Sequence, residues 1–162
     1  MAEATEKLVT RSRKVAFMKV AEDFIRMQYF TSMAKNANPK EYSRSYVDVD
    51  GEVSDVTGYA PSIGYSFDRY QGNKVHDEII KITDGELTGT DAVREILIVD
   101  LTTKEEMGQT YDALLRPYSV IPDAEGDSTD AYTYSGNFKS NGVQKAVKVT
   151  LDETAMKATL SE

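Results

Sequence analysis

Residues 42–70 read YSRSYVDVDGEVSDVTGYAPSIGYSFDRY, and this tyrosine-rich stretch decides the fold. In its second half, over residues 61–70, Ile63, Tyr65 and Phe67 alternate with small or polar residues. A period of two places the apolar side chains on one face of a strand and the others on the opposite face. The sequence therefore predicts a strand with Ile63, Tyr65 and Phe67 in the core and a solvent-facing second side.

The first half of the stretch contains Asp50-Gly51, a strong signal for a hairpin turn. A two-residue turn places Val49 opposite Glu52, and a slip of one residue places it opposite Val53. Neither register gives one apolar face across both strands, so the register is weakly specified. The hairpin over residues 42–59 is therefore either a floppy loop or a projection that docks on another chain. The contacts expected of a docking hairpin are Tyr42, Tyr46, Val47, Val49, Val53, Val56 and Tyr59.

Residues 75–84 carry a helical pattern, because an apolar stripe that includes Ile79 and Ile82 repeats at the spacing of a helix face. Asn73 is a candidate N-cap, and Gly85 is expected to stop the helix. A helix this short is unstable alone, so it is expected to lie on a sheet with Ile79 and Ile82 in the core.

Residues 92–101 form the strongest strand pattern, and its centre, residues 96–99, is apolar on both faces. Such a strand should be covered on both sides. Leu97 and Val99 are expected in the core, with the helix over one end of the second face and a neighbouring subunit over the rest.

Further strands are predicted over residues 15–20, 110–120, 131–138, 143–151 and 155–160. Residues 20–30 fit either a strand or a helix, and their aromatic and β-branched content favours a strand over 25–31. About eight strands and one short helix without βαβ alternation predict an antiparallel β-sandwich or barrel. The remaining core positions expected from alternation are Tyr132, Tyr134, Val147 and Val149.

Composition narrows the class of protein. The net charge of −8 and pI near 4.8 argue against a surface that grips nucleic acid, which needs clustered lysine and arginine. The absence of cysteine excludes disulfides and thiolate metal sites. No apolar run reaches the length of a membrane span, and residues 1–14 lack the apolar core of a secretory signal, so folding in the cytoplasm is expected.

The chain is expected to divide into a flexible N-terminal arm, residues 1–13, and one β domain, residues 14–162. Lys7, Arg11 and Arg13 make the arm the most basic part of an acidic protein. These three cations are the arm residues expected to contact an acidic neighbour; the alternative is a solvated tail.

No residues predict catalysis, a cofactor or a bound metal. His76 is the only histidine, and neither a nucleophile elbow nor a glycine-rich oxyanion loop surrounds it, so it is interpreted as a polar residue in the first turn of a helix. Asp48, Asp50 and Glu52 lack the rest of a twelve-residue calcium loop. The acidic residues 122–130 are interpreted as a solvated loop. The protein is therefore not expected to be an enzyme.

The chain also resembles a known family over residues 13–160. The segments that carry the resemblance are KVAFMKV (14–20), KEYSRSYVDVDGEVSDVTGYAPSIGYSFDRY (40–70), KVHD (74–77), DAVREILIVDL (91–101) and YTYSGNFK (132–139). Their pattern is similar to the tail tube, or major tail, proteins of phages and prophages of Gram-positive bacteria.

This resemblance implies a β-sandwich subunit that forms rings, commonly hexameric, stacked into a hollow tube through which double-stranded DNA leaves without specific binding. It implies that the hairpin at residues 42–59 reaches the next ring. The implied partners are further copies, the tape measure protein, tail tip or baseplate and terminator proteins, and in contractile tails a sheath. The implied location is the virion tail, assembled in the host bacterial cytoplasm.

Two alternatives stay open from the sequence. One is a monomeric β-sandwich binding module, for example for carbohydrate, which predicts an exposed aromatic platform and no assembly. The other is the tube of a phage-like bacteriocin. The sequence does not distinguish a long flexible tail from a contractile one.

Overall fold

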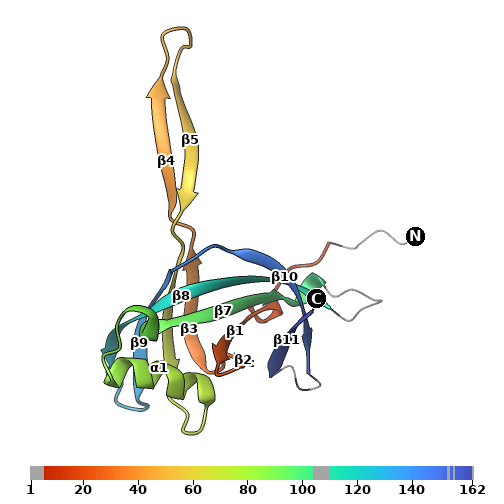
Figure 1. The fold of residues 1–162 in the computed structure, drawn as a ribbon, viewed down its shortest axis with the longest axis vertical. Helices are drawn as coiled ribbons and strands as arrows, with labels where there is room; N and C mark the ends of the chain where they lie inside the picture. The colour runs from red at the N-terminus through yellow and green to blue at the C-terminus, as the bar shows by residue number, and fades with distance from the viewer. Residues whose placement is uncertain (1–5, 104–109, 153, 155, 162) are drawn as a thin grey trace, which may run out of the picture.

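The structure, a computed structural model, describes residues 6–103, 110–152, 154 and 156–161. It is mainly β, with one α-helix, a nine-stranded antiparallel sheet and a separate two-stranded hairpin (Figure 1), which confirms the predicted fold class. In chain order the elements are η1 (Arg11–Arg13), β1 (Lys14–Val20), β2 (Asp23–Arg26), β3 (Phe30–Asn36), β4 (Pro39–Ser45), β5 (Glu52–Tyr59), β6 (Ser62–Asp68), α1 (Lys74–Asp84), η2 (Gly89–Ala92), β7 (Val93–Asp100), η3 (Leu101–Thr103), β8 (Tyr111–Glu125), β9 (Thr133–Ser140), β10 (Lys145–Leu151) and β11 (Lys157–Ser161).

Part of the large sheet closes on itself. The strand order is β10-β11-β2-β1-β7-β8-β9-β6-β3, and an additional pairing joins β10 to β8. The strands β1, β2, β11, β10, β8 and β7 therefore form a closed antiparallel barrel, and every one of them contributes to its apolar interior. The buried residues of this first core are Phe17, Phe24, Leu97, Val99, Ala113, Leu115, Val149 and Ala158.

A second core lies between the other face of the sheet and α1, which crosses the end of the body away from the hairpin (Figure 1). The sheet contributes mainly aromatic side chains from β6, β8 and β9, and α1 contributes the stripe predicted from the sequence. Its members include Phe67, Tyr65, Phe138, Tyr118, Tyr134, Ile63, Ile79 and Ile82.

The two cores explain the doubly apolar strand β7. Ile96 packs into the core under α1, whereas Leu97 and Val99 point into the barrel. The helix covers the Ile96 end of one face, as expected, whereas Ile98 further along that face is only half-buried, so coverage there by a neighbouring subunit stays a prediction. The opposite face, that of Leu97 and Val99, lies inside the barrel. Strands β10 and β11 of the same chain cover it, because the pairing of β10 with β8 curls the sheet over itself.

Residues 20–30 are strands and turns, not a helix. β1 and β2 are joined at Ala21, whose φ of 57° reverses the chain, and Tyr29 has a φ of 65° just before β3. The predicted strand over residues 25–31 is therefore split between β2 and β3, and residues 27–29 connect them.

The ends of α1 agree in part with the prediction. Asn73 caps the helix, because its Oδ1 accepts hydrogen bonds from the amides of Val75 and His76 at 3.1 and 3.2 Å. At the other end Gly85 keeps a right-handed φ of −80°, and Glu86 adopts the left-handed conformation at 49°. Gly85 follows the helix for a different reason: a Cβ there would lie 2.8 Å from the Lys81 carbonyl oxygen.

Most of the expected core positions are buried, and two expectations need correction. Tyr132 is 51% exposed, because β9 begins only at Thr133 and the Tyr132 hydroxyl reaches Glu125 instead of the core. Val147 is half-buried at the edge of the barrel core. His76 lies in the first turn of α1, as interpreted from the sequence, and it is fully buried. The buried members are Ile63, Tyr65, Phe67, Ile79, Ile82, Leu97, Val99, Tyr134 and Val149.

Gly136 is required by the close approach of two neighbouring strands. It pairs with Tyr65 of β6, and a Cβ at this position would collide with the Ile121 carbonyl oxygen and lie 2.7 Å from the Tyr65 hydroxyl. We expect Gly136→Ala to lower the free energy of unfolding by about 1–3 kcal/mol, because backbone atoms must shift. Gly64→Ala is the control, since the nearest atom to its Cβ lies 3.6 Å away. Urea unfolding of both variants checks this, and equal losses would contradict it.

The Tyr65 hydroxyl is buried and has no hydrogen-bond partner among the described residues. Burial, and secondarily the charge of Asp123, raise its pKa well above the ordinary value, so the hydroxyl stays protonated and unpaired. Leaving such a group unpaired costs about 1–3 kcal/mol, so we expect Tyr65→Phe to unfold at the same or higher urea concentration. A loss of more than about 1 kcal/mol would instead reveal a hydrogen bond to this hydroxyl.

Candidate assembly interface

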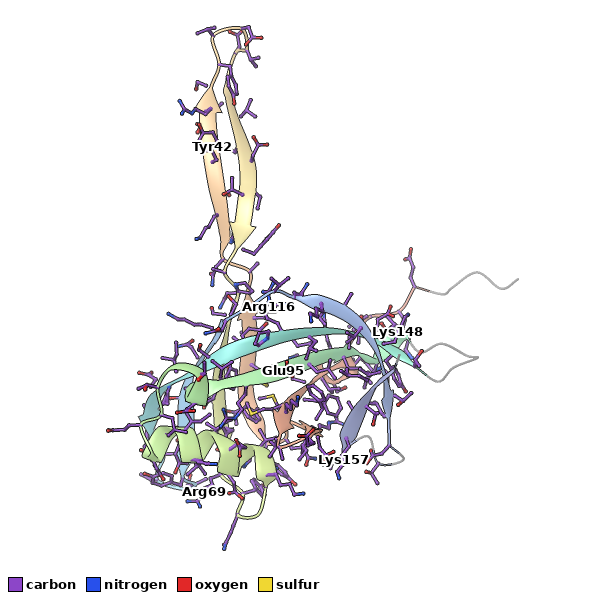
Figure 2. The ribbon with its side chains drawn as sticks, in the orientation of Figure 1. Tyr42, Arg69, Glu95, Arg116, Lys148 and Lys157 are labelled. Carbon is purple, nitrogen blue, oxygen red and sulfur yellow. The ribbon has the colours of Figure 1, made fainter. Side chains whose placement is uncertain are left out.

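The hairpin of β4 and β5 stands apart from both cores. It projects from one end of the body, and its side chains, including Tyr42, stand clear of the nine-stranded sheet (Figures 1 and 2). Neither core cluster includes a residue of the hairpin. All of its predicted contact residues are exposed: Tyr42, Tyr46, Val47, Val49, Val53, Val56 and Tyr59.

The register of the hairpin differs from both registers considered from the sequence. The last pair is Ser45 with Glu52, so residues 46–51 form a longer loop that contains the Asp50-Gly51 signal. The hydroxyls of Ser43 and Ser54 share a hydrogen bond of 2.8 Å across the strands. Polar pairs therefore set the register, and the valines are left on the outside without cross-strand apolar partners.

The base of the hairpin is fixed to the body. Asn38, in a left-handed conformation with φ of 46°, donates from its side-chain amide to the Ala60 carbonyl and the Ser62 hydroxyl at 3.1 and 3.0 Å. The Ala60 amide donates back to the Asn38 carbonyl at 3.2 Å. The hairpin thus leaves the sheet in a defined direction and begins at Pro39, earlier than predicted.

The outer half of the hairpin is both apolar and acidic. Residues 46–56 contain four carboxylates and no lysine or arginine, and Val47 at the tip is fully exposed. The carboxylates are Asp48, Asp50, Glu52 and Asp55. An exposed apolar patch with charged neighbours is typical of a protein-binding surface.

The predicted basic arm is bound to the body in part. Arg11 donates to the Lys14 carbonyl at 2.7 Å and to the Met33 carbonyl of β3 at 3.3 Å, and Arg13 donates to the Leu101 carbonyl at 3.1 Å. The body therefore begins at η1 and not at residue 14. Lys7 is exposed, and residues 1–5 of the predicted arm lie outside the described residues.

In the described parts of the chain, no group of side chains forms a catalytic or metal site. The Nδ1 of His76 accepts from the Tyr70 amide at 3.0 Å, and Nε2 then donates to the Gln28 carbonyl at 2.8 Å, so both ring nitrogens are engaged. Burial lowers the pKa of His76, which keeps the imidazole neutral. Over residues 6–103 and 110–161, with the undescribed positions excepted, no three acidic or histidine side chains gather at a metal-binding distance. Within the same ranges α1 is too short and polar to cross a membrane.

Comparison by sequence finds neither a family model nor a curated protein that matches the chain. Comparison by structure finds similar folds in particle tails. A chain in the tail of an empty GTA particle with C6 symmetry superposes with a TM-score of 0.62 at 10% identity, over 85% of this chain and 98% of that one.

Two further chains have the same fold. One, in the virion of a native gene transfer agent particle, has a TM-score of 0.61 at 10% identity, over 86% of this chain and 98% of that one. The other, in the tube-terminating cap of the anti-feeding prophage, has a TM-score of 0.53 at 11% identity, over 90% and 95%. The fold of this chain is therefore that of tail-tube proteins.

Proposed function

We propose that the chain is the structural subunit of a phage tail tube, which forms hexameric rings that stack into a hollow conduit for double-stranded DNA. The hairpin carries this proposal: a tail-tube fold extends an acidic, valine-bearing hairpin that no part of its own core covers. The C6 symmetry of the similar GTA tail supports six subunits per ring.

Two surfaces serve the two directions of assembly. The hairpin contacts the next ring along the tube axis, and its exposed valines gain burial there. Strand β3 is the last strand of the large sheet, so its outer backbone edge is open to a lateral neighbour. Pairing between subunits covers such an edge, which otherwise invites aggregation.

The charge of the subunit suits a conduit. A net charge of −8 repels the phosphate backbone and leaves the duplex free to slide. In this proposal the protein has no catalytic role. Its partners are further copies, a tape measure protein, tail tip or baseplate and terminator proteins and, in a contractile tail, a sheath. It belongs to the virion of a phage or prophage of Gram-positive bacteria and assembles in the host cytoplasm.

Electron microscopy of the concentrated protein tests the proposal. Purified subunits, alone and with assembled tail tips as nuclei, are expected to give rings or tubes with six-fold end views. Tip-nucleated samples are included because tube growth can be gated by nucleation. Light scattering that shows only monomers at high concentration with nuclei present would overturn the proposal.

One observation favours the second candidate, a monomeric carbohydrate-binding module. The rings of Tyr29 and Tyr70 are half-exposed and stack with centroids 3.7 Å apart. Sugar binding requires an open aromatic face. In this pair each ring covers one face of the other, so only the two outer faces are open to a sugar. Glycan binding that is lost in Tyr70→Ala, from a protein that stays monomeric, would favour this candidate.

Tubes that carry no DNA in mature particles would favour a bacteriocin.

A further inference from the structure

A groove lies between β1 and the open edge of β3, at the end of the body from which the hairpin rises. It encloses about 330 Å³, and residues 9–11 pass along one side of it. Five strands of the sheet contribute to its apolar lining: β1, β3, β6, β7 and β8 supply Ala16, Met33, Ile63, Ile98 and Leu114. The groove is thus an apolar trough in the face that α1 leaves uncovered.

Four cations surround this trough. Arg11, Lys14 and Lys35 line it. Burial lowers the pKa of the Lys35 ammonium group, and the nearby charges of Arg116 and Lys14 lower it further, which places Arg116 beside the cluster. Of the ion pairs between described residues, none includes Lys14, Lys35 or Arg116. The Nε of Arg116 is buried without a hydrogen-bond partner among the described residues.

One carboxylate lies close to this cluster. Asp100 is near enough to Lys14 to offset part of its charge, and its Oδ1 also accepts hydrogen bonds from the amide and hydroxyl of Thr102 at 3.0 and 2.6 Å. The groove therefore presents apolar surface and a surplus of positive charge on a protein whose net charge is −8. A ligand that fits it is extended, acidic and partly apolar.

The hairpin tip has this chemistry. Residues 46–51 offer Val47 and Val49 as exposed apolar side chains, with Asp48 between them and Asp50 directly after. The tip of the same chain points away from the body and cannot reach its own groove (Figure 1). Arg116 lies just below the base of the hairpin in Figure 2, so a second copy displaced along the hairpin axis brings its tip level with the groove.

We propose that the groove beside β3 is the acceptor for the hairpin tip of a second copy, with Val47 and Val49 in the trough and Asp48 and Asp50 facing Lys14, Lys35 and Arg116. This inference rests on the proposed tube function and names the surface that receives the hairpin. Duplex DNA is the competing occupant, and a net acidic chain disfavours it.

Cysteine cross-linking tests the contact, because the chain contains no cysteine of its own. Val49→Cys combined with Lys35→Cys is expected to give a ladder of disulfide-linked copies on a non-reducing gel of assembled tubes. Val49→Cys combined with Lys81→Cys is the matched control, since Lys81 is an exposed lysine on α1. Tubes in which the first pair forms no more ladder than the control would overturn the acceptor site and leave the tube function standing. Failure of the unaltered subunit to form tubes would overturn both.

A charge exchange supplies an independent readout. Asp48→Lys with Asp50→Lys is expected to slow tube elongation about tenfold or more, because like charges then meet in the groove. Adding Lys14→Glu and Lys35→Glu to the same chain is expected to restore the rate. Asp127→Lys with Asp130→Lys makes the same charge change on another exposed loop and is expected to have little effect. If the four-fold variant does not regain the rate, the proposal is overturned. It is also overturned if the double variant Lys14→Glu with Lys35→Glu elongates normally but no longer retains DNA.

Discussion

A subunit with a shortened hairpin is expected to fold normally and to be unable to elongate tubes. Removing residues 41–57 and joining Lys40 to Gly58 through Asn-Gly keeps the pair nearest the base and supplies a two-residue turn. No residue of the deleted segment belongs to either core, so the thermal midpoint should change little. Electron microscopy with tail tips as nuclei should show no growth.

The physical reason is the balance between ordering and burial. Fixing the backbone costs about 1–2 kcal/mol per residue, and in the free subunit the exposed valines bury too little surface to offset this. A neighbour that buries them returns about 25 cal/mol per Å² of apolar surface, and repetition around a ring makes stacking cooperative. Hydrogen exchange of the hairpin amides should therefore be fast in the monomer and slow in the tube.

A variant with milder changes distinguishes the contribution of the valine side chains to elongation from that of the hairpin backbone. Val47→Ser with Val49→Ser should weaken elongation without changing the fold, whereas Val143→Ser replaces an exposed valine outside the hairpin and should have no effect. Equal exchange protection of the hairpin in both states, or normal elongation by the shortened subunit, would show that the hairpin is not the stacking element.

The sequence predicted the elements that depend on local pattern. Strand β6 has the expected alternation, and α1 begins and ends close to the predicted residues, since both signals lie within a few positions of one another. It left open whether the strands form a sandwich or a closed barrel. Closure depends on β8, a strand of 15 residues whose first part pairs with β10 and whose second part pairs with β9.

The strand predicted over residues 110–120 is shorter than β8, because β8 contains prolines. Proline in a strand is usually confined to an edge or a bulge, yet Pro117 lies within the ladder opposite Glu95, and the irregularity is between Pro122 and Ala124. The predicted end at residue 120 is therefore too early, since the strand continues to Glu125, within the segment interpreted as a solvated loop. The groove was also missed, because Lys14, Lys35 and Arg116 come from three strands distant in sequence and only the tertiary structure brings them together.

The sequence placed His76 in the first turn of a helix, and a signal for its burial was also present but was not used. His76 precedes Ile79 by three positions and so lies on the same helix face as the apolar stripe. In the structure its ring stacks on Phe67 with centroids 4.4 Å apart, and its two nitrogens join the Tyr70 amide to the Gln28 carbonyl. It ties the loop after β6 to the loop before β3.

Replacement of His76 is therefore expected to destabilise the subunit strongly. His76→Ala leaves a cavity and two unpaired backbone groups, and we expect it to lower the free energy of unfolding by about 3 kcal/mol or more. His76→Phe keeps the ring and the stacking on Phe67 but loses both hydrogen bonds, so its loss should be smaller. Urea unfolding measures both, and a near-neutral His76→Ala would contradict the structural role.

The same site predicts how stability depends on pH. Burial lowers the pKa of His76 below 6.5, because the imidazolium would be desolvated and its second proton would meet the Tyr70 amide. The unfolded chain therefore binds a proton near pH 6.5 that the folded chain does not, and the free energy of unfolding falls as pH drops below that value. His76 is the only histidine, so the difference between wild type and His76→Phe isolates its contribution from that of the carboxylates. Urea midpoints recorded between pH 5 and 8 should converge as pH falls, and a constant separation would show that His76 titrates alike in both states.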